Sequence, residues 1–291
     1  MLNYYIIYLL YQILIFKNVI MEDAILKRII NIISNKNYHS RNTTVKLKQK
    51  FENKGFIVSE TYSHNAELNI CVGGDGGFLR AVHRNKFPTI PFIGINTGHL
   101  GFFQEILPEN IDDFITKYIN KDYKVEEMTL VKAEIVTNQK SYFLTGVNEI
   151  VIKGIKSKVV HLEIFIDENH LERFSGDGII ISTPSGSTAY NFSSGGSIVY
   201  PSIESLQITP LAPINSKAFR SLLNSAIIPG DLVILVKPEL RYENSLLVVN
   251  DGMEFKYNNI KRIELKMSEN KIYKLNFSKD TYWNNLKSKF L

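Results

Sequence analysis

One acidic residue inside a run of glycines is the first feature of this sequence that could do chemistry. The run reads Gly73-Gly74-Asp75-Gly76-Gly77. It follows an apolar stretch over residues 68–72 and precedes a predicted helix over 78–84. Glycines at such a junction let backbone N–H groups approach a phosphate closely, and the N-terminus of a helix favours an anion. The alternative is a strand-to-helix turn that needs glycine only for its backbone.

The acidic residue, Asp75, makes it less favoured that this is only a structural turn. A carboxylate among phosphate-binding N–H groups repels the ligand, so it needs a function of its own. It could hold Mg²⁺, or it could accept a hydrogen bond and then a proton from a ribose hydroxyl. A Walker A motif is absent from the sequence, because no Gly-Lys-Ser/Thr occurs. The GxGxxG fingerprint also fails, because its last glycine would fall on Leu79.

Two further polar segments follow predicted strands. The longer one reads Thr183-Pro184-Ser185-Gly186-Ser187-Thr188-Ala189-Tyr190. Its hydroxyls could bind a base and a sugar while Tyr190 supplies a flat apolar face, although by composition it is only a polar loop. The shorter one, Asn148-Glu149, is predicted at the end of a strand. Its amide and carboxylate could read an adenine edge or accept from hydroxyls, but the pair alone indicates little.

The elements that must position these residues change character along the chain. Strands are predicted over 28–33, 56–58, 68–72 and 91–96, with helices over 43–55, 78–84 and 108–121. This alternation predicts a parallel α/β sheet. After about residue 126, short strands are predicted over 131–137, 141–147, 161–167, 172–175, 178–183, 232–237, 246–250 and 262–266. Short strands divided by turns favour an all-β domain, in which Asp251-Gly252 fits a tight hairpin turn. Trp283, Leu286 and Phe290 predict one packing face of a terminal helix.

Composition limits the class of protein. The chain has 291 residues, of which 44% are apolar and 22% charged, so it is neither disordered nor fibrous. Its net charge of +5 arises mostly from scattered lysines, which favours a solvated surface over a nucleic-acid patch; charge alone does not decide among nucleic acid, a membrane surface and an anionic small ligand. The single cysteine, Cys71, excludes a disulfide framework within the chain and favours the cytoplasm. The histidines form no metal-ligand motif, and no protein metal site is predicted.

The N-terminal segment differs from the rest of the chain. Residues 4–16 are nearly all apolar or Tyr, which is too short a stretch to span a bilayer. No Lys or Arg precedes them, and no small-residue cleavage site follows. The segment could associate weakly with a membrane, form a buried extra helix, or result from translation begun upstream of the true start. We favour the last, with Met21 as a natural start, and expect no membrane partner.

Taken in order, the motifs closely resemble the NAD kinase family. The ordered set is Gly73-Gly74-Asp75-Gly76, Asn96-Thr97-Gly98-His99-Leu100-Gly101-Phe102, Asn148-Glu149, Gly176-Asp177-Gly178 and Thr183 to Tyr190. The likeness covers about residues 28–291. The first motif alone is shared with a wider superfamily that includes diacylglycerol and sphingosine kinases. The string from Thr183 to Tyr190, together with Asn148-Glu149, distinguishes the NAD kinases.

The resemblance implies an NAD kinase fold. This is an α/β plus all-β architecture, with a Rossmann-like α/β domain over 28–126 and a β-sandwich-like NAD-binding domain over 127–266. Residues 267–291 would return to the first domain, and residues 1–27 would be an extension. The resemblance also implies a homodimer or homotetramer, with substrate near a neighbouring subunit.

The resemblance further implies that ATP phosphorylates the 2′-hydroxyl of the adenosine ribose of NAD, with Mg²⁺ or another divalent ion. Asp75 would be the catalytic carboxylate. The residues expected to bind NAD are Asp75, Gly76, Phe102, Phe103, Asn148, Glu149, Arg173, Asp177, Ser185, Thr188, Ala189, Tyr190, Ser193 and Asp251. Those expected at the phosphates of ATP are Gly73, Gly74, Gly76, Gly77 and Arg80, with backbone N–H groups of Gly74, Gly76 and Gly77 as donors.

Two positions depart from the family pattern. Members usually have Thr after the Gly-Gly-Asp-Gly motif, whereas this chain has Gly77. Many bacterial members have Arg before Gly-Asp-Gly, whereas Ser175 stands there and Arg173 lies two residues earlier. Two alternatives to an NAD kinase stay open at this point: a lipid kinase of the wider superfamily and a non-catalytic NADP-binding sensor. An oxidoreductase is less favoured, because the dinucleotide fingerprint is missing.

Overall fold

The computed structural model describes residues 28–98, 101–215, 220–239, 246–278 and 280–291. The predictions for residues 1–27, and for His99 and Leu100, lie outside these ranges. The chain divides into two compact units. Unit 1 contains the described residues up to Phe78, together with 92–122 and 280–291, and unit 2 contains 79–91 and 123–278. The expected boundaries at 126 and 266 therefore differ from the observed ones at 122 and 278, and the segment 79–91 groups with the second unit.

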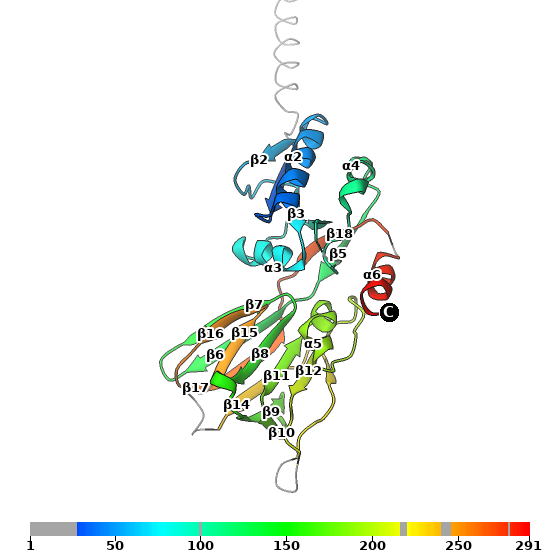
Figure 1. The fold of residues 1–291 in the computed structure, drawn as a ribbon. Helices are drawn as coiled ribbons and strands as arrows, with labels where there is room; N and C mark the ends of the chain where they lie inside the picture. Colours follow the sequence, from blue (N-terminus) through cyan, green and yellow to red (C-terminus); the bar gives the residue numbers. More distant parts are fainter. Residues whose placement is uncertain (1–27, 99–100, 216–219, 240–245, 279) are drawn as a thin grey trace, which may run out of the picture. The chain divides into compact units, whose positions relative to one another are not determined.

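Unit 1 is built on parallel strands, as the alternation of elements predicts (Figure 1). The strands are β1 (Ile29–Ser34), β2 (Ile57–Ser59), β3 (Leu68–Gly73) and β4 (Phe92–Asn96), in the spatial order β2-β1-β3-β4. Every residue of β3 and β4 is buried. Strands buried on both faces read as continuous apolar runs, and the sequence shows such runs here.

The helices of unit 1 differ in how much they bury, and the longest of them contacts β1, β2 and β3. They are α2 (Tyr38–Glu52), the first turn of α3 (Asp75–Arg84), the 3₁₀ helix η1 (Pro108–Asn110), α4 (Ile111–Ile119) and α6 (Thr281–Phe290). The Asn37 side chain accepts a hydrogen bond from the Ser40 N–H, which fixes the start of α2 five residues before the predicted start. Phe51 contacts Phe56 and Phe114 edge-on and closes the aromatic part of the core.

Unit 2 contains two antiparallel sheets. The first, ordered β10-β9-β14-β17-β6-β7, consists of β6 (Val131–Thr137), β7 (Ser141–Gly146), β9 (Val160–Ile166), β10 (Asn169–Gly176), β14 (Ile234–Pro238) and β17 (Ile260–Met267). The second, ordered β13-β12-β11-β8-β15-β16, consists of β8 (Glu149–Gly154), β11 (Gly178–Ser182), β12 (Ser205–Leu211), β13 (Ala226–Pro229), β15 (Leu246–Asn250) and β16 (Met253–Lys256). The remaining elements are η2 (Ile155–Ser157), η3 (Ser185–Thr188), α5 (Tyr190–Ser193) and the antiparallel pair β5 (Lys124–Met128) with β18 (Ile272–Asn276).

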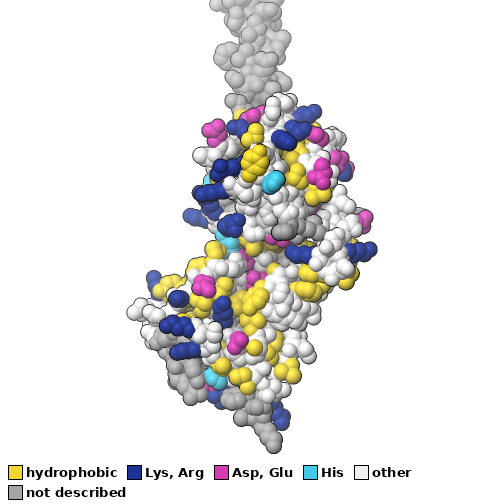
Figure 2. Space-filling model, viewed as in Figure 1, with side chains coloured by type: hydrophobic (Ala, Val, Ile, Leu, Met, Phe, Trp, Pro, Cys, Tyr) yellow, Lys and Arg dark blue, Asp and Glu magenta, His cyan; other side chains and the backbone are white. Residues whose placement is uncertain are grey.

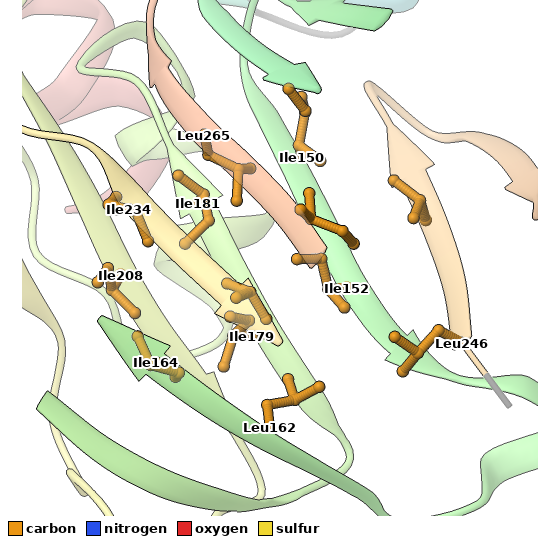
Figure 3. Close-up of a cluster of buried hydrophobic side chains, with 14 of the residues drawn as sticks. Ile150, Ile152, Leu162, Ile164, Ile179, Ile181, Ile208, Ile234, Leu246 and Leu265 are labelled. Carbon is orange, nitrogen blue, oxygen red and sulfur yellow. The ribbon is translucent and has the colours of Figure 1, made fainter. Parts of the chain in front are cut away.

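The two sheets of unit 2 share one apolar core. Figure 3 shows Ile150, Ile152, Ile179 and Ile181 of one sheet lying among side chains of the other, such as Leu265. All five are fully buried. Burial of each such side chain contributes about 1.5–3 kcal/mol, so this core accounts for much of the stability of the unit. The expected β-sandwich is therefore present.

Several elements of the structure were not predicted from the sequence, or were predicted with different details. The strands β5, β8, β12, β13, β16 and β18 are absent from the predictions, and β16 was missed although the predicted Asp251-Gly252 turn directly precedes it. Asn148-Glu149 was expected at the end of a strand, but Glu149 begins β8. Helix α6 is present, but Trp283 is 52% exposed, so its expected place on the packing face is wrong. The partly or fully buried residues of α6 are Thr281, Tyr282, Asn285, Leu286 and Phe290. None of the helices in the described ranges has both the length and the apolar character that a bilayer span requires.

Candidate active site

The glycine run forms the turn between β3 and α3 in unit 1, as the sequence predicts. The Gly74 carbonyl accepts hydrogen bonds from the N–H groups of Gly77 and Phe78, at 2.8 and 3.3 Å, and from the Gln104 side-chain amide at 3.2 Å. The first N–H groups of a helix have no helical partner, so this turn can bind an anion. The expectation that the Gly77 N–H also binds phosphate is not met in this arrangement, because that N–H is used within the turn.

The carboxylate of Asp75 lies at the first residue of α3. Its Oδ2 accepts from the Phe102 N–H at 2.9 Å and its Oδ1 from the Phe103 N–H at 3.0 Å. Lys289 of α6 places Nζ 3.9 Å from Oδ2. The Asp75 side chain is 27% exposed, and each oxygen retains a second lone pair. The carboxylate is thus held by its own unit and can still accept a hydrogen bond from a hydroxyl group.

The two phenylalanines beside Asp75 have different environments. The Phe102 ring contacts Phe290, with ring centroids 5.8 Å apart, and lies 4.8 Å from Lys289 Nζ. Phe103 is only 5% exposed and stacks on Phe78 at 4.6 Å. Phe103 belongs to the core and Phe102 packs against α6, and the expected place of these rings near an adenine stays a prediction.

In unit 2 the loop that follows β11 packs directly on the turn at Asn148-Glu149. The Thr183 N–H donates to the Asn148 carbonyl at 2.8 Å, and the Thr183 hydroxyl donates to the Val147 carbonyl at 2.7 Å. A Cβ at Gly186 would lie 2.7 Å from Asn148 Cα, so the close approach requires glycine. Strands β8 and β11 are neighbours in the sheet, and this pairing joins the two polar segments.

Asp251 supports the same turn from the other side, because β15 is the second neighbour of β8. Asp251 and Gly252 have φ values of 46° and 82° and form the predicted hairpin turn between β15 and β16. The Asp251 side chain is fully buried. It accepts from the N–H groups of residues 147, 148 and 149, at 2.7, 2.8 and 3.1 Å, and its Oδ2 lies 2.7 Å from Nε2 of His83. Four donors occupy the four lone-pair positions of a carboxylate, so Asp251 shapes the turn instead of contacting NAD as expected.

Two side-chain oxygens at this turn are buried and lack a hydrogen-bond partner in the part of the chain that the structure describes. They are Asn148 Oδ1 and Glu149 Oε2. Buried polar atoms in folded proteins are nearly always paired, so these two neighbouring exceptions make the turn a candidate site for a water molecule or a ligand that donates hydrogen bonds. Burial and, secondarily, the negative charge of Asp251 raise the pKa of the Glu149 carboxyl to about 8. A perturbed carboxyl of this kind is typical of binding and catalytic sites.

Comparison with known families identifies the fold and the activity. The model of the ATP-NAD kinase N-terminal domain matches residues 18–123, and that of the ATP-NAD kinase C-terminal domain matches residues 147–277. An NAD kinase of Finegoldia magna is 50% identical over 268 residues, which are 91% of this chain and 98% of that protein. NAD kinase 1 of Oceanobacillus iheyensis is 36% identical over 229 residues, which are 77% and 85% of the two chains. The chain belongs to the NAD kinase family.

Solved structures confirm the NAD kinase fold. Yeast NADH kinase complexed with NADH has a TM-score of 0.76 at 20% identity, covering 90% of this chain and 87% of the yeast chain. An NAD kinase from Archaeoglobus fulgidus in complex with ATP has a TM-score of 0.73 at 24% identity, covering 89% and 99%. With the relatives at 36% and 50% identity, these findings support an enzyme that transfers a phosphoryl group and argue against a lipid kinase.

Five other residues that are expected to bind NAD lie close together in the sequence of unit 2. Ser185, Thr188 and Ala189 lie in the loop that contacts Asn148-Glu149, and Tyr190 and Ser193 lie on α5 directly after it. Tyr190 is 46% exposed, so its ring is available for stacking. The direct contacts of these residues with NAD stay predictions.

Asp177 and Arg173 lie elsewhere. Asp177 precedes β11 and Thr183 follows it, so the extended strand separates them by roughly 20 Å. Arg173 on β10 is exposed and donates to Glu239. Within one chain, therefore, the described structure does not bring these two expected ligands of NAD to the turn at Asn148-Glu149.

Gly77, where the family usually has Thr, lies against the side chain of Asn35. A Cβ at Gly77 would lie 2.9 Å from Oδ1 and 3.2 Å from Nδ2 of Asn35. The Asn35 side chain also covers Gly73, where an added Cβ would approach its Cγ to 2.8 Å. Asn35 thus occupies the space into which the usual threonine would project. Arg80 is exposed on α3, and its expected contact with ATP stays a prediction.

Replacing Gly101 with Ala is expected to lower NAD kinase activity at least tenfold while the protein remains folded. The new Cβ would lie 2.5 Å from Asp75 Cγ, and closer still to Oδ1, so the carboxylate must leave its two N–H donors. A misplacement of about 1 Å at a catalytic group can lower the reaction rate about a hundredfold. Gly98→Ala is the matched control, because no atom in the described ranges, apart from those of its chain neighbours, lies within 4 Å of its added Cβ. Steady-state rates of NADP formation would compare the two, and equal rates would contradict the expectation.

Sequence reasoning missed three residues that lie beside expected site residues within their own units. Gly101 and Lys289 contact Asp75, and His83 contacts Asp251. No local pattern distinguishes Lys289 from the other lysines of α6, or His83 from the other histidines. Gly101 belongs to a motif that was recognised, but the reason for its glycine is visible only in the folded unit.

Proposed function

We propose that the enzyme transfers the γ-phosphoryl group of ATP to the 2′-hydroxyl of the adenosine ribose of NAD and so produces NADP. The observation that carries the proposal is the pair of buried oxygens without partners, Asn148 Oδ1 and Glu149 Oε2. The hydroxyl groups of ribose and the amino group of adenine are donors that such oxygens bind. Because Glu149 has a raised pKa, it also offers a donor of its own when it is protonated.

In this proposal Asp75 orients the 2′-hydroxyl and accepts its proton as the hydroxyl oxygen bonds to the γ-phosphorus, while the bond from that phosphorus to the β,γ-bridging oxygen breaks and ADP leaves. Phosphoryl transfer depends mainly on positioning and on electrostatic stabilisation. The segment after β4 supports the first requirement, because the N–H groups of Phe102 and Phe103 fix Asp75. The N-terminal turn of α3, with its glycines, supplies N–H groups for the phosphates of ATP.

We propose that Mg²⁺ or another divalent ion accompanies ATP. No group of three or more His, Cys, Asp or Glu side chains is placed to hold a metal ion within the described ranges. This donor set still fits Mg²⁺, which proteins commonly bind through one or two carboxylates together with substrate phosphates. In this proposal the phosphates of ATP hold the ion, which neutralises their charge, and Asp75 remains free for the 2′-hydroxyl.

One assay tests the proposal. Purified protein is incubated with Mg-ATP and NAD, and NADP is measured with an NADP-specific dehydrogenase. We expect ATP-dependent formation of NADP, whereas a protein that binds NADP tightly without turnover would be a sensor. Parallel reactions with NADH, polyphosphate and a diacylglycerol vesicle define the acceptor and the donor. Phosphorylation of the lipid in place of NAD would overturn the proposal.

We also propose a cytoplasmic homodimer or homotetramer in which Asp177 and Arg173 reach NAD bound to a neighbouring subunit. The distance along β11 supports this arrangement. Large apolar side chains exposed on unit 2, including Ile203, Leu223 and Ile227, offer a surface for such contacts; Figure 2 shows exposed hydrophobic side chains on one face.

Mixing two inactive variants should then restore activity. Asp75→Asn and Asp177→Ala proteins, unfolded and refolded together, are expected to recover a substantial fraction of wild-type activity, because some interfaces contain both intact residues. Each variant refolded alone is the control, and light scattering gives the oligomeric state. A monomeric wild-type enzyme, or no recovery in mixtures shown to contain hetero-oligomers, would contradict the arrangement.

A further inference from the structure

His83 contacts the buried carboxylate that shapes the turn at Asn148-Glu149. It lies in the last turn of α3, in the part of that helix that belongs to unit 2. Its Nε2 is 2.7 Å from Asp251 Oδ2, and its side chain is 15% exposed. Because Asp251 accepts three backbone N–H bonds, the fourth contact requires a donor, and the hydrogen of the imidazole is therefore on Nε2. Phe87 packs edge-on against the ring at 4.9 Å and holds its orientation.

The contacts form a chain from His83 to the NAD-binding residues. Asp251 Oδ2 is shared between the His83 ring and the Val147 N–H, whereas Oδ1 accepts from the N–H groups of Asn148 and Glu149. Loss of the His83 donor would leave one lone pair of a fully buried carboxylate without a partner, which is costly in a medium of low polarity. The carboxylate would then rotate or admit water, and the three N–H bonds that define the turn would weaken.

Loss of the His83 donor would disturb the Asn148-Glu149 turn and leave the residues around Asp75 unchanged. The side chains of Asn148 and Glu149 present the two unpaired oxygens, Asn148 Oδ1 and Glu149 Oε2, and their positions depend on the backbone that Asp251 holds. Asp75 and its donors, Phe102 and Phe103, belong to unit 1 and make no part of this chain of contacts. A defect at His83 should therefore affect the binding of NAD more than the binding of ATP or the chemical step.

We propose that His83 is a positioning residue for NAD, which acts through Asp251 on the Asn148-Glu149 turn. The inference rests on the proposed function of that turn. It adds a residue outside the recognised motifs, at the far end of the helix that begins with Asp75. His83 does not contact the substrate in this proposal, and its effect is transmitted by one hydrogen bond to a buried carboxylate.

The test compares three variants. His83→Phe keeps a ring against Phe87 but removes the donor, whereas His83→Gln places an amide N–H near the position of Nε2. His64→Phe is the matched control, because the His64 ring packs edge-on against Tyr62 on an exposed surface. We expect His83→Phe to raise the KM for NAD about tenfold, as for loss of a hydrogen bond to a charged group, with kcat and the KM for ATP within about twofold of wild type. His83→Gln should recover most of the affinity.

Hydrogen exchange supplies a readout that does not depend on activity. The N–H groups of Val147, Asn148 and Glu149 should exchange faster in His83→Phe than in wild type, and His83→Gln should restore their protection. This result would support the positioning role even if the wild-type protein made no NADP, so the two proposals can fail separately. Titration with NAD in the absence of ATP should show the same order of affinities, with wild type and His83→Gln above His83→Phe.

Several outcomes would overturn the inference. The KM for NAD could be unchanged in His83→Phe, or raised equally in the Phe and Gln variants. Exchange could accelerate throughout the sandwich instead of at the three amides. If His83→Phe does not fold, His83→Asn serves in its place, because its amide is too short to reach Asp251. A His83→Asn protein with the affinity of His83→Gln would then refute the role of the hydrogen bond.

Discussion

Replacing Asp75 with Asn is expected to slow NADP formation at least a hundredfold while NAD still binds. A positioned general base typically contributes ~10²–10⁴ in rate, and the amide cannot accept the proton of the 2′-hydroxyl. Its NH₂ group would also face one of the two N–H donors of residues 102 and 103, which a carboxylate accepts without conflict. The rate at saturating NAD and ATP, with NAD binding measured by calorimetry, separates loss of chemistry from loss of binding.

The matched control is Asp113→Asn, the same change on the exposed surface of α4, where the carboxylate pairs only with Lys117 four residues later among the contacts described. It should retain wild-type rates, because an exposed pair of this kind contributes little. Turnover of a folded Asp75→Asn protein within a few-fold of wild type would exclude Asp75 as the base. It would leave the carboxylate with the structural role that its contacts to Phe102 and Phe103 already show.

Replacing Glu149 with Gln is expected to change how stability depends on pH. Burial and the charge of Asp251 raise the pKa of Glu149 to about 8 from an ordinary value of 4.5. Between these values the folded carboxyl keeps its proton and the unfolded one loses it, so the free energy of unfolding falls as pH rises from about 4.5 to about 8. Above pH 8 the full penalty remains, and at about 1.4 kcal/mol per unit it reaches about 4–5 kcal/mol.

The Gln side chain does not ionise, so the Glu149→Gln protein lacks this loss. Urea unfolding of both proteins at pH 5 and pH 9 should show that the variant gains several kcal/mol over wild type at the higher pH. Glu109→Gln, on the exposed turn η1, is the control and should show no such divergence. Parallel unfolding curves of Glu149→Gln and wild type at the two pH values would contradict a protonated, buried Glu149.

The Glu149→Gln replacement should also change the binding of NAD. The unpaired Oε2 of Glu149 is an acceptor when the group is ionised and a donor or an acceptor when it is protonated. Gln supplies both an acceptor and a donor in a similar shape, so a moderate loss of NAD affinity is expected rather than its abolition.

The sequence by itself determined the local features of this protein. The glycine turn before α3, the parallel strands of unit 1 and the hairpin turn at Asp251-Gly252 follow from short-range chemistry. Glycine tolerates conformations that other residues resist, buried parallel strands read as apolar runs, and the Asp-Gly pair favours a tight turn. The order of the motifs was also sufficient to recognise the family, because motif order is a property of the chain and not of its folding.

Only the tertiary structure decided which side chains meet. Asn148-Glu149 lies between Thr183 and Asp251 because β8 lies between β11 and β15, an order that no pattern in the sequence states. The same pairing made Asp251 a buried support for the turn instead of a ligand of NAD, and it placed Asp177 at the opposite end of β11. Long-range pairing depends on the sum of many weak contacts over the whole sheet, so residues distant in sequence, such as His83 and Asp251, reveal their relation only after the chain has folded.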